Sequence, residues 1–306
     1  MRIGINGSSL IALGRPTSEI AAQAAAAEAD GFSTYWAAQL AVPDALTALA
    51  VVAGATTTIE LGTAVIPIWL RHPLMLAGQA LTLSEIAGGR VLLGIGLAHK
   101  STIEESLGIP FSRPAATMDE YLAVLLPALR ERAVDVSGSI YSGHVEAVSG
   151  PADVPTPSVM LAAMGPRMLE LAGARTDGNI LWLSGPRTIE TQIRPALDAA
   201  ATAAERPAPR IVASVPVCVT DDPDSVKGLI ATVLDGYNDL PSYRGVMDQE
   251  GAAGPADVSL VGDEATVRAG LERFASAGTT DFSALEIPTN ADEEARTRAL
   301  LKDMLP

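Results

Sequence analysis

The sequence contains one cysteine, few charged residues and no long apolar run, and each of these shortages excludes a class of protein. The single cysteine, Cys218, excludes an internal disulfide and fits a reducing cytosol. Because Cys218 lies in an apolar, strand-like segment, we expect a buried thiol and not a nucleophile. Only 19% of the 306 residues are charged and 48% are hydrophobic, which excludes a disordered chain. No apolar run reaches the roughly 18 residues of a membrane span, and the first residues begin a strand without a basic or apolar leader. We therefore expect a cytoplasmic protein.

Positive charge is also scarce. The chain has 21 Lys and Arg residues against 36 Asp and Glu residues, which gives a net charge of −15. This balance repels the phosphates of nucleic acid, so we expect no nucleic-acid partner. An anionic ligand must instead be met by a local cluster of donors, and we expect the partner to be a small molecule.

Short apolar segments alternate with longer segments rich in Ala and Leu along nearly the whole chain. The apolar segments of strand length lie at residues 2–6, 32–38, 58–68, 91–96, 158–164, 178–184, 210–220 and 281–289. The first three are followed by predicted helices at 17–29, 44–55 and 73–87. Strands that are apolar throughout are typical of a parallel sheet covered on both faces. Eight such units predict an α/β fold, a closed (β/α)8 or TIM barrel, in a single domain over residues 1–306.

Two further segments add to this barrel. Residues 134–148 alternate in polarity and contain glycine turns, so they predict a small hairpin that is inserted outside the main sheet after the fourth helix. The segment DDPDSV at 221–226 offers Asp as a helix cap and proline in the first turn. A terminal helix is expected after the eighth strand.

The fourth predicted strand ends in a pair of glycines, in the segment GRVLLGIGLAHKS at 89–101. A dinucleotide-binding turn of the Rossmann type would need a third glycine where His99 stands, and it would follow the first strand. This segment is therefore not a Rossmann turn. Glycine at the end of a buried strand lets a ligand approach the backbone. In a barrel the active site forms at the C-terminal ends of the strands, so this turn should face it.

Four segments carry a resemblance to a known family: ADGF at 29–32, LGTAV and RHP at 61–73, GGRVLLGIG, HK and LGI at 88–109, and AAMGPRMLELAGARTDG at 162–178. In this order and spacing the chain resembles the bacterial-luciferase-like superfamily, most of all its deazaflavin-dependent branch, which contains methylenetetrahydromethanopterin reductases. The resemblance covers nearly the whole chain. It implies a barrel enzyme that uses coenzyme F420, or FMN as in other branches, and a homodimer.

The resemblance also assigns residues to the cofactor. It implies a cis peptide bond at Ala64–Val65 behind the flavin ring, where the residues alone would favour an ordinary trans bond. It places the cofactor's phosphate at the helix that begins near Gly165 and Arg167, where free N–H groups and the helix dipole suit an anion. For Arg167 and Lys100 the alternative to a contact with the cofactor is that each is a solvated surface residue. The residues expected to contact the cofactor are Trp36, Gln39, Ala64, Val65, Gly96, Leu97, Ala98, Lys100, Ala163, Met164, Gly165, Pro166 and Arg167. No metal site is expected.

His99 is the expected catalytic residue, because an imidazole exchanges protons near neutral pH. The alternative is a histidine that only bonds the loop backbone. Relatives that oxidise alcohols carry an Asp-His pair where this chain has Gln39 and Leu40, neither of which can take up a proton. This departure favours reduction, with a hydride passing to a C=C, C=N or C=O bond of a small apolar acceptor and a proton coming from His99.

Two other functions remain open on the same barrel, an FMN-dependent monooxygenase and a flavin-binding protein without turnover. Among the remaining candidate residues, Trp36 and Trp69 either form an apolar wall over the ring or belong to the core. His72 is expected to cap the next helix or to pack beneath the site. Glu286 ends the eighth strand and is a further candidate for the pocket, and His144 in the hairpin receives no role.

Overall fold

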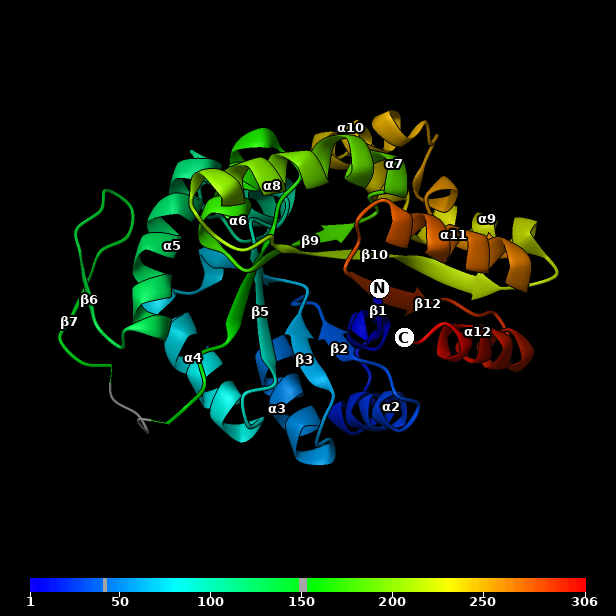
Figure 1. Ribbon diagram of the computed structural model, residues 1–306, viewed down its shortest axis with the longest axis horizontal. Helices are drawn as coiled ribbons and strands as arrows, with labels where there is room; N and C mark the ends of the chain where they lie inside the picture. Colours follow the sequence, from blue (N-terminus) through cyan, green and yellow to red (C-terminus); the bar gives the residue numbers. More distant parts are fainter. Residues whose placement is uncertain (41–42, 149–152) are drawn as a thin grey trace.

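The centre of the molecule is a closed barrel of parallel strands surrounded by helices (Figure 1). The computed structural model describes residues 1–40, 43–148 and 153–306. The barrel strands are β1 (Arg2–Asn6), β2 (Thr34–Ala37), β3 (Glu60–Thr63), β5 (Val91–Gly96), β8 (Ser158–Ala162), β9 (Gly178–Trp182), β10 (Arg210–Val219) and β12 (Asp281–Glu286). They pair in this order, and β12 pairs again with β1, which closes the barrel. Each predicted apolar segment contains one of these strands, so the predicted TIM-barrel fold is confirmed.

Helices cover the outside of the barrel between successive strands (Figure 1). The main ones are α2 (Thr17–Ala29), α3 (Ala45–Ala55), α4 (Pro73–Ile86), α5 (Pro114–Arg130), α6 (Pro166–Arg175), α8 (Arg194–Ala203), α11 (Glu264–Ser276) and α12 (Ala291–Asp303). Several of these helices begin next to a residue whose side chain caps the first turn. Asp44 accepts a hydrogen bond from the backbone N–H of Thr47 at 2.9 Å, so α3 begins just after it. No helix in the described part of the chain is both long and apolar enough to span a bilayer.

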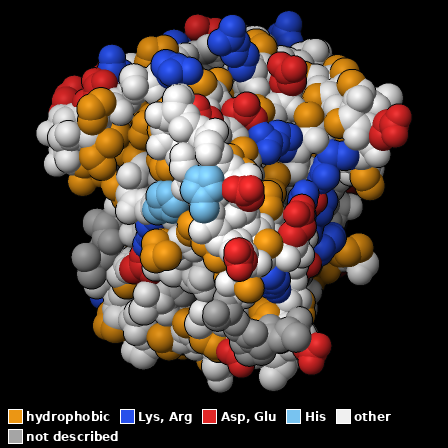
Figure 2. Space-filling model, turned by 90° about the vertical axis from the view of Figure 1, so that its left-hand side faces the viewer, with side chains coloured by type: hydrophobic (Ala, Val, Ile, Leu, Met, Phe, Trp, Pro, Cys, Tyr) orange, Lys and Arg blue, Asp and Glu red, His pale blue; other side chains and the backbone are white. Residues whose placement is uncertain are grey.

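Two insertions leave the barrel. The predicted hairpin is confirmed as the antiparallel pair β6 (Val134–Val136) and β7 (Gly143–Val145), which projects beside α5 (Figure 1). Figure 2 shows the side of the molecule that lies at the left of Figure 1, where the hairpin projects. Among the described residues on this side, Lys and Arg side chains are interspersed with Asp and Glu and form no continuous basic surface.

The second insertion lies between β10 and β11 (Leu260–Gly262). It contains α9 (Pro223–Val233), the short helix η4 (Asp235–Asp239), α10 (Pro241–Glu250) and the short helix η5 (Pro255–Asp257). The start of α9 is as predicted, because Asp222 caps it by accepting from the Ser225 N–H at 3.1 Å. The sequence pattern did not predict the fold of the rest of this insertion.

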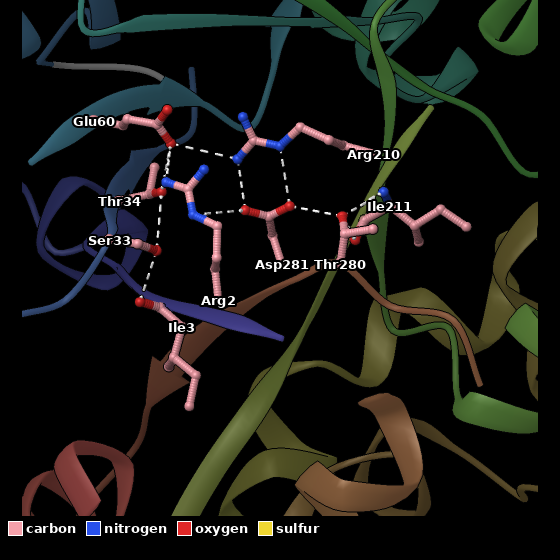
Figure 3. Close-up of polar contacts among 9 residues, drawn as sticks. All are labelled: Arg2, Ile3, Ser33, Thr34, Glu60, Arg210, Ile211, Thr280 and Asp281. Atoms are coloured by element: carbon pink, nitrogen blue, oxygen red, sulfur yellow. Dashed lines mark hydrogen bonds and ion pairs between the residues drawn. The ribbon is translucent and has the colours of Figure 1, made fainter. Parts of the chain in front are cut away.

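The N-terminal end of the barrel is closed by four charged side chains that point toward one another (Figure 3). Arg210 donates to both carboxylate oxygens of Asp281, at 2.5 and 3.1 Å, and reaches Glu60 at 3.4 Å. Arg2 pairs with Glu60 and lies 3.6 Å from Asp281. Burial acts to lower the pKa of Arg210, but the hydrogen bonds and the negative charges of Asp281 and Glu60 together outweigh this and raise the pKa. These four residues begin different strands, so they join the strands at the end of the barrel away from the site.

Above this layer an apolar cluster fills part of the barrel interior. Trp36 packs with Leu92, Met160, Ile180 and Val212, and its exposed fraction is 0%. A Cβ added at Gly62 would lie 2.2 Å from the Trp36 ring, so glycine there makes room for the indole. Trp36 is therefore part of the inner core, and the expectation that it contacts the cofactor is wrong.

Cys218 lies in β10 with an exposed fraction of 0%, and burial raises the pKa of its thiol to about 11. The thiol is therefore buried and protonated near neutral pH, as its apolar sequence context predicted.

Candidate active site

The C-terminal ends of β3, β5 and β8 form a continuous, half-buried surface. The peptide bond between Ala64 and Val65 is cis, as the resemblance implies. The Ala64 N–H donates to the Ala37 carbonyl at 2.9 Å, and the Val65 carbonyl accepts from the Gln39 N–H at 3.3 Å. A Cβ at Gly96 would lie 2.7 Å from the Val65 side chain and 3.1 Å from Ala162. Glycine at the end of β5 therefore lets the Ala64–Val65 segment pack directly against the next strands.

The loop after β5 is held in one conformation by side chains around it. The Trp69 indole Nε1 donates to the Leu97 carbonyl at 2.8 Å, and the Trp69 ring lies 5.0 Å from the Phe111 ring. Ala98 has a left-handed backbone with φ of 55°. Lys100 is exposed and lies 3.6 Å from Glu104 on its own helical turn. Trp69 therefore supports the loop, while Lys100 points to a surface partner.

His99 lies in an aromatic environment. Its ring is 5.6 Å from the Tyr243 ring and 5.8 Å from the Tyr237 ring, both edge to face. Its backbone carbonyl accepts from the Ile103 N–H at 3.0 Å, but no described residue forms a hydrogen bond with the imidazole itself. In the described part of the chain the imidazole thus makes no hydrogen bond to the loop backbone. Burial favours the uncharged ring and lowers the pKa of His99 below its ordinary value.

Helix α6 begins with an open N-terminus. Its cap residue Gly165 provides no side-chain hydrogen bond, its first residue is Pro166, and its first turn contains no acidic residue. Arg167 is exposed, and no ion pair joins it to the rest of the described chain. The first N–H groups of a helix have no partner inside the helix, and their dipole attracts anions. This end of α6 is thus suited to a phosphate.

An open groove of about 840 Å³ lies beside this helix start. Its lining residues are Pro166, Arg187, Thr191, Gln192, Asp248 and Gln249. Gln192 donates from Nε2 to the Met164 carbonyl at 3.3 Å, which joins the groove wall to the end of the β8 loop. Arg187 is exposed at this groove and supplies a positive charge near the α6 N-terminus.

Other predicted residues support the site or lie away from it. The Gln39 side-chain oxygen accepts from the Ala45 N–H at 3.0 Å, at the start of α3. Ala163 is only 3% exposed, and its carbonyl accepts from Asn179, so it lies behind the exposed surface. His72 caps α4 by accepting from the Leu74 N–H at 3.3 Å, as predicted.

Glu286 and His144 also find partners outside the site. Glu286 pairs with Arg298 on α12, so its candidacy for the pocket is wrong. His144 lies 2.8 Å from Asp135 on the exposed hairpin. Trp182, Tyr237, Tyr243 and Arg187 were not predicted at all. The two tyrosines carry no local signal, because only the fold of the second insertion brings them to the mouth.

Comparison with known proteins identifies the family. Residues 4–281 match the family model described as luciferase-like monooxygenase. The chain therefore belongs to the luciferase-like monooxygenase family and is an enzyme of this oxidoreductase class.

Individual relatives share parts of the sequence. The chain is 36% identical over 128 residues to a Mycobacterium tuberculosis protein named "putative coenzyme F420-dependent oxidoreductase", over 42% of this chain and 37% of that protein. It is 31% identical over 142 residues to the 5,10-methylenetetrahydromethanopterin reductase of Methanolobus tindarius, over 46% of this chain and 43% of that protein. The matched segments thus span less than half the length of these relatives.

Solved structures share the whole barrel. The coenzyme F420-dependent tetrahydromethanopterin reductase of Methanopyrus kandleri superposes with a TM-score of 0.83 at 22% identity, over 99% of this chain and 98% of that one. A Pseudomonas putida type II Baeyer–Villiger monooxygenase in complex with FMN superposes with a TM-score of 0.77 at 18% identity, over 99% and 96%. At these identities the likeness shows the fold.

Proposed function

We propose that this protein is a coenzyme F420-dependent oxidoreductase that reduces a small apolar acceptor at a C=C, C=N or C=O bond. The observation that carries the proposal is the continuous surface from Val65 through Ala162 to the open N-terminus of α6, with Arg187 at the adjoining groove. An apolar surface suits a flat ring, and a free helix start suits its phosphate. The charge of Arg187 at the groove suits an anionic tail longer than that of FMN, and Asp248, which also lines the groove, is paired with Arg244. The names of the relatives support the same cofactor.

When bound, a reduced deazaflavin supplies a hydride. The chain's own residues then have separate tasks. Ala64 and Val65 support the ring from one side, and the N–H groups that begin α6 hold the phosphate. A ring nitrogen of His99 donates a proton to the acceptor, and the surrounding aromatic rings keep water from it. The side-chain amide of Gln39 has no basic group, which agrees with the reductive direction.

Titration of the purified protein with coenzyme F420 and, separately, with FMN tests this proposal. We expect the fluorescence of F420 to be quenched on binding, with an affinity clearly higher than that for FMN. Tighter binding of FMN would contradict the proposal and favour a monooxygenase on the same barrel. Binding of neither cofactor would contradict both.

Arg187→Ala should separate the two cofactors. Loss of this exposed cation is expected to weaken F420 binding about three- to tenfold, since one charge-assisted contact to the tail is removed. FMN, whose tail ends at the phosphate, should bind within about twofold of the wild-type affinity. Arg268→Ala is the matched control, because it removes the same charge from a surface pair with Asp303 on α12. An equal loss of affinity for both cofactors in Arg187→Ala would contradict this role.

The reduction should depend on pH through His99. Proton donation needs the charged imidazole, so kcat/KM should fall as the pH rises through the His99 pKa. Burial lowers that pKa, so the midpoint should lie below the ordinary value of 6.5. Tyr243→Ala exposes the ring and should move the midpoint upward, toward 6.5. The check is a pH profile of both proteins, and a downward shift in the variant would contradict the assignment.

We propose that the enzyme acts as a homodimer through α3 and α4, which pack against each other. Helix α3, with the sequence ALTALAVVAGA, contains no charged residue although the chain carries a net charge of −15. Its Val51 is 43% exposed, and Met75 and Ile86 on α4 are 64% and 47% exposed. An outer face with exposed apolar side chains and little charge, with Glu85 as the exposed carboxylate on α4, is typical of an interface between copies.

Light scattering tests the dimer. The wild-type protein should have twice the mass of one chain, and the double variant Val51→Glu, Met75→Glu should have the mass of one chain, because each copy would place charges in the apolar contact. Leu229→Glu on α9 is the control, since it adds a charge to an exposed leucine on a different helix and should leave the dimer intact. A monomeric wild-type protein at micromolar concentration would contradict the proposal.

A further inference from the structure

The second insertion carries two tyrosines to the mouth of the barrel on a rigid support. Leu183, Met247, Ala252 and Val258 form a small buried core, against which Trp182, Tyr237 and Tyr243 pack. This core joins the insertion to the end of β9. The insertion is therefore built as a fixed wall of the mouth.

Hydrogen bonds fasten the same insertion to the barrel. The carboxylate of Glu250, at the end of α10, accepts from the Arg187 N–H at 3.1 Å and from the Thr188 N–H at 2.9 Å. The Thr188 hydroxyl donates to the Val246 carbonyl at 3.1 Å. A Cβ at Gly185 would lie 2.2 Å from Glu250, so glycine there lets the two segments approach closely. The tyrosines are thus held in place by both polar and apolar contacts.

The aromatic rings of this wall contact one another edge to face. The Tyr237 and Tyr243 rings are 4.8 Å apart, and Trp182 lies 6.3 Å from Tyr237. Both tyrosines also contact the His99 ring, which comes from the loop after β5. We define these three residues, Trp182, Tyr237 and Tyr243, as the aromatic wall. The aromatic wall thus contacts His99, the proposed proton donor, with the faces and edges of its rings.

The aromatic wall approaches from across the barrel. Its tyrosines pack against Trp182 and Leu183 at the end of β9, which lies three strands from β3 in the closed strand order, and β3 leads to Val65. A ring supported on Val65 would therefore face this wall, and the acceptor must bind between the two. The acceptor would contact His99 and the tyrosine rings at the same time.

We propose that the aromatic wall selects planar, conjugated carbonyl compounds, such as aryl ketones, over flexible aliphatic ones. This inference rests on the proposed function and names the substrate class of the same site. Aromatic side chains favour a further ring in an edge-to-face or offset arrangement beyond the gain from buried area. They also have few rotatable bonds, as does a flat ligand, so little conformational entropy is lost when they meet.

The test compares acetophenone with 2-octanone, a flat and a flexible ketone with equal numbers of carbon atoms. Binding is measured by calorimetry with the protein alone and with the protein loaded with oxidised F420, and KM and kcat follow with reduced F420. We expect acetophenone to bind about two- to tenfold more tightly. Tyr243→Leu should remove this preference, and Tyr243→Phe, which retains the ring, should keep it.

Further variants separate the wall from general effects on stability. Tyr237→Leu tests the same wall at a second position and should also reduce the preference. Tyr141→Leu is the control, because the Tyr141 ring contacts Tyr121 and His72 and is not part of the aromatic wall, so its loss should not change the preference. Equal affinity of the wild-type protein for the two ketones, or an equal loss for both in Tyr243→Leu, would overturn the inference. Failure of F420 to bind would instead overturn the proposed function, since the preference between ketones is measured without the cofactor as well.

Discussion

His99→Gln is expected to lower kcat for reduction by about 10²–10⁴-fold, because glutamine keeps a polar side chain of similar length but has no acidic group that can donate a proton near neutral pH. The affinity for F420 should stay within about twofold, because the imidazole is assigned to the acceptor and not to the ring or its phosphate. Steady-state kinetics with reduced F420 and a direct F420 titration measure the two quantities separately.

His144→Gln is the matched control for this experiment. His144 lies on the exposed hairpin beside Asp135, away from the barrel mouth, so its replacement should leave kcat unchanged. A His99→Gln enzyme with unchanged kcat would show that another group delivers the proton. A large loss of F420 affinity in the same variant would show that His99 binds the cofactor.

Asp281→Asn is expected to lower the free energy of unfolding by about 3 kcal/mol, at the low end for a broken buried ion pair. The carboxylate is 4% exposed, while the Arg2 and Arg210 side chains that it pairs with are 38% and 26% exposed. The variant leaves both guanidinium groups without this partner at the closed end of the barrel (Figure 3). Their partial exposure lets water compensate some of the loss. Urea unfolding followed by circular dichroism gives the change in midpoint.

Asp303→Asn makes the same chemical change in an exposed pair. Asp303 is 69% exposed and pairs with Arg268, so its replacement should cost less than about 1 kcal/mol. If the two variants had equal midpoints, the four charges at the end of the barrel would contribute no more than a surface ion pair.

Much of the barrel follows from patterns that act over a few residues. Apolar strand segments and helix caps are local features, so the predicted helix at 17–29 matches α2 at both ends and the predicted start at 73 matches α4. The hairpin at 134–148 was visible for the same reason, because alternation and glycine turns are read over one segment. The segments that resemble the luciferase-like family also lie at strand ends, where the barrel fold brings Val65, Gly96 and Ala162 into contact.

Trp36 and Trp69 show that such patterns do not contain the direction in which a side chain points. Trp36 lies within β2 and Trp69 lies just after the third predicted strand, and both had the same two interpretations. Trp36 turns inward above Gly62 and is fully buried, whereas Trp69 lies beside the mouth and holds the Leu97 carbonyl. The direction of each side chain depends on the register of neighbouring strands, and the partners that set it are distant in sequence.

By itself, the sequence of this protein determined the succession of strands and helices, the capped helix starts and the family to which the chain belongs, because these depend on local composition and spacing. Only the tertiary structure decided which side chains meet. It placed Tyr237 and Tyr243 against His99, Arg187 beside the start of α6, and Glu286 on Arg298. These contacts join residues far apart in the chain, and they are set by barrel closure and by the packing of an insertion whose own sequence carries no sign of its position.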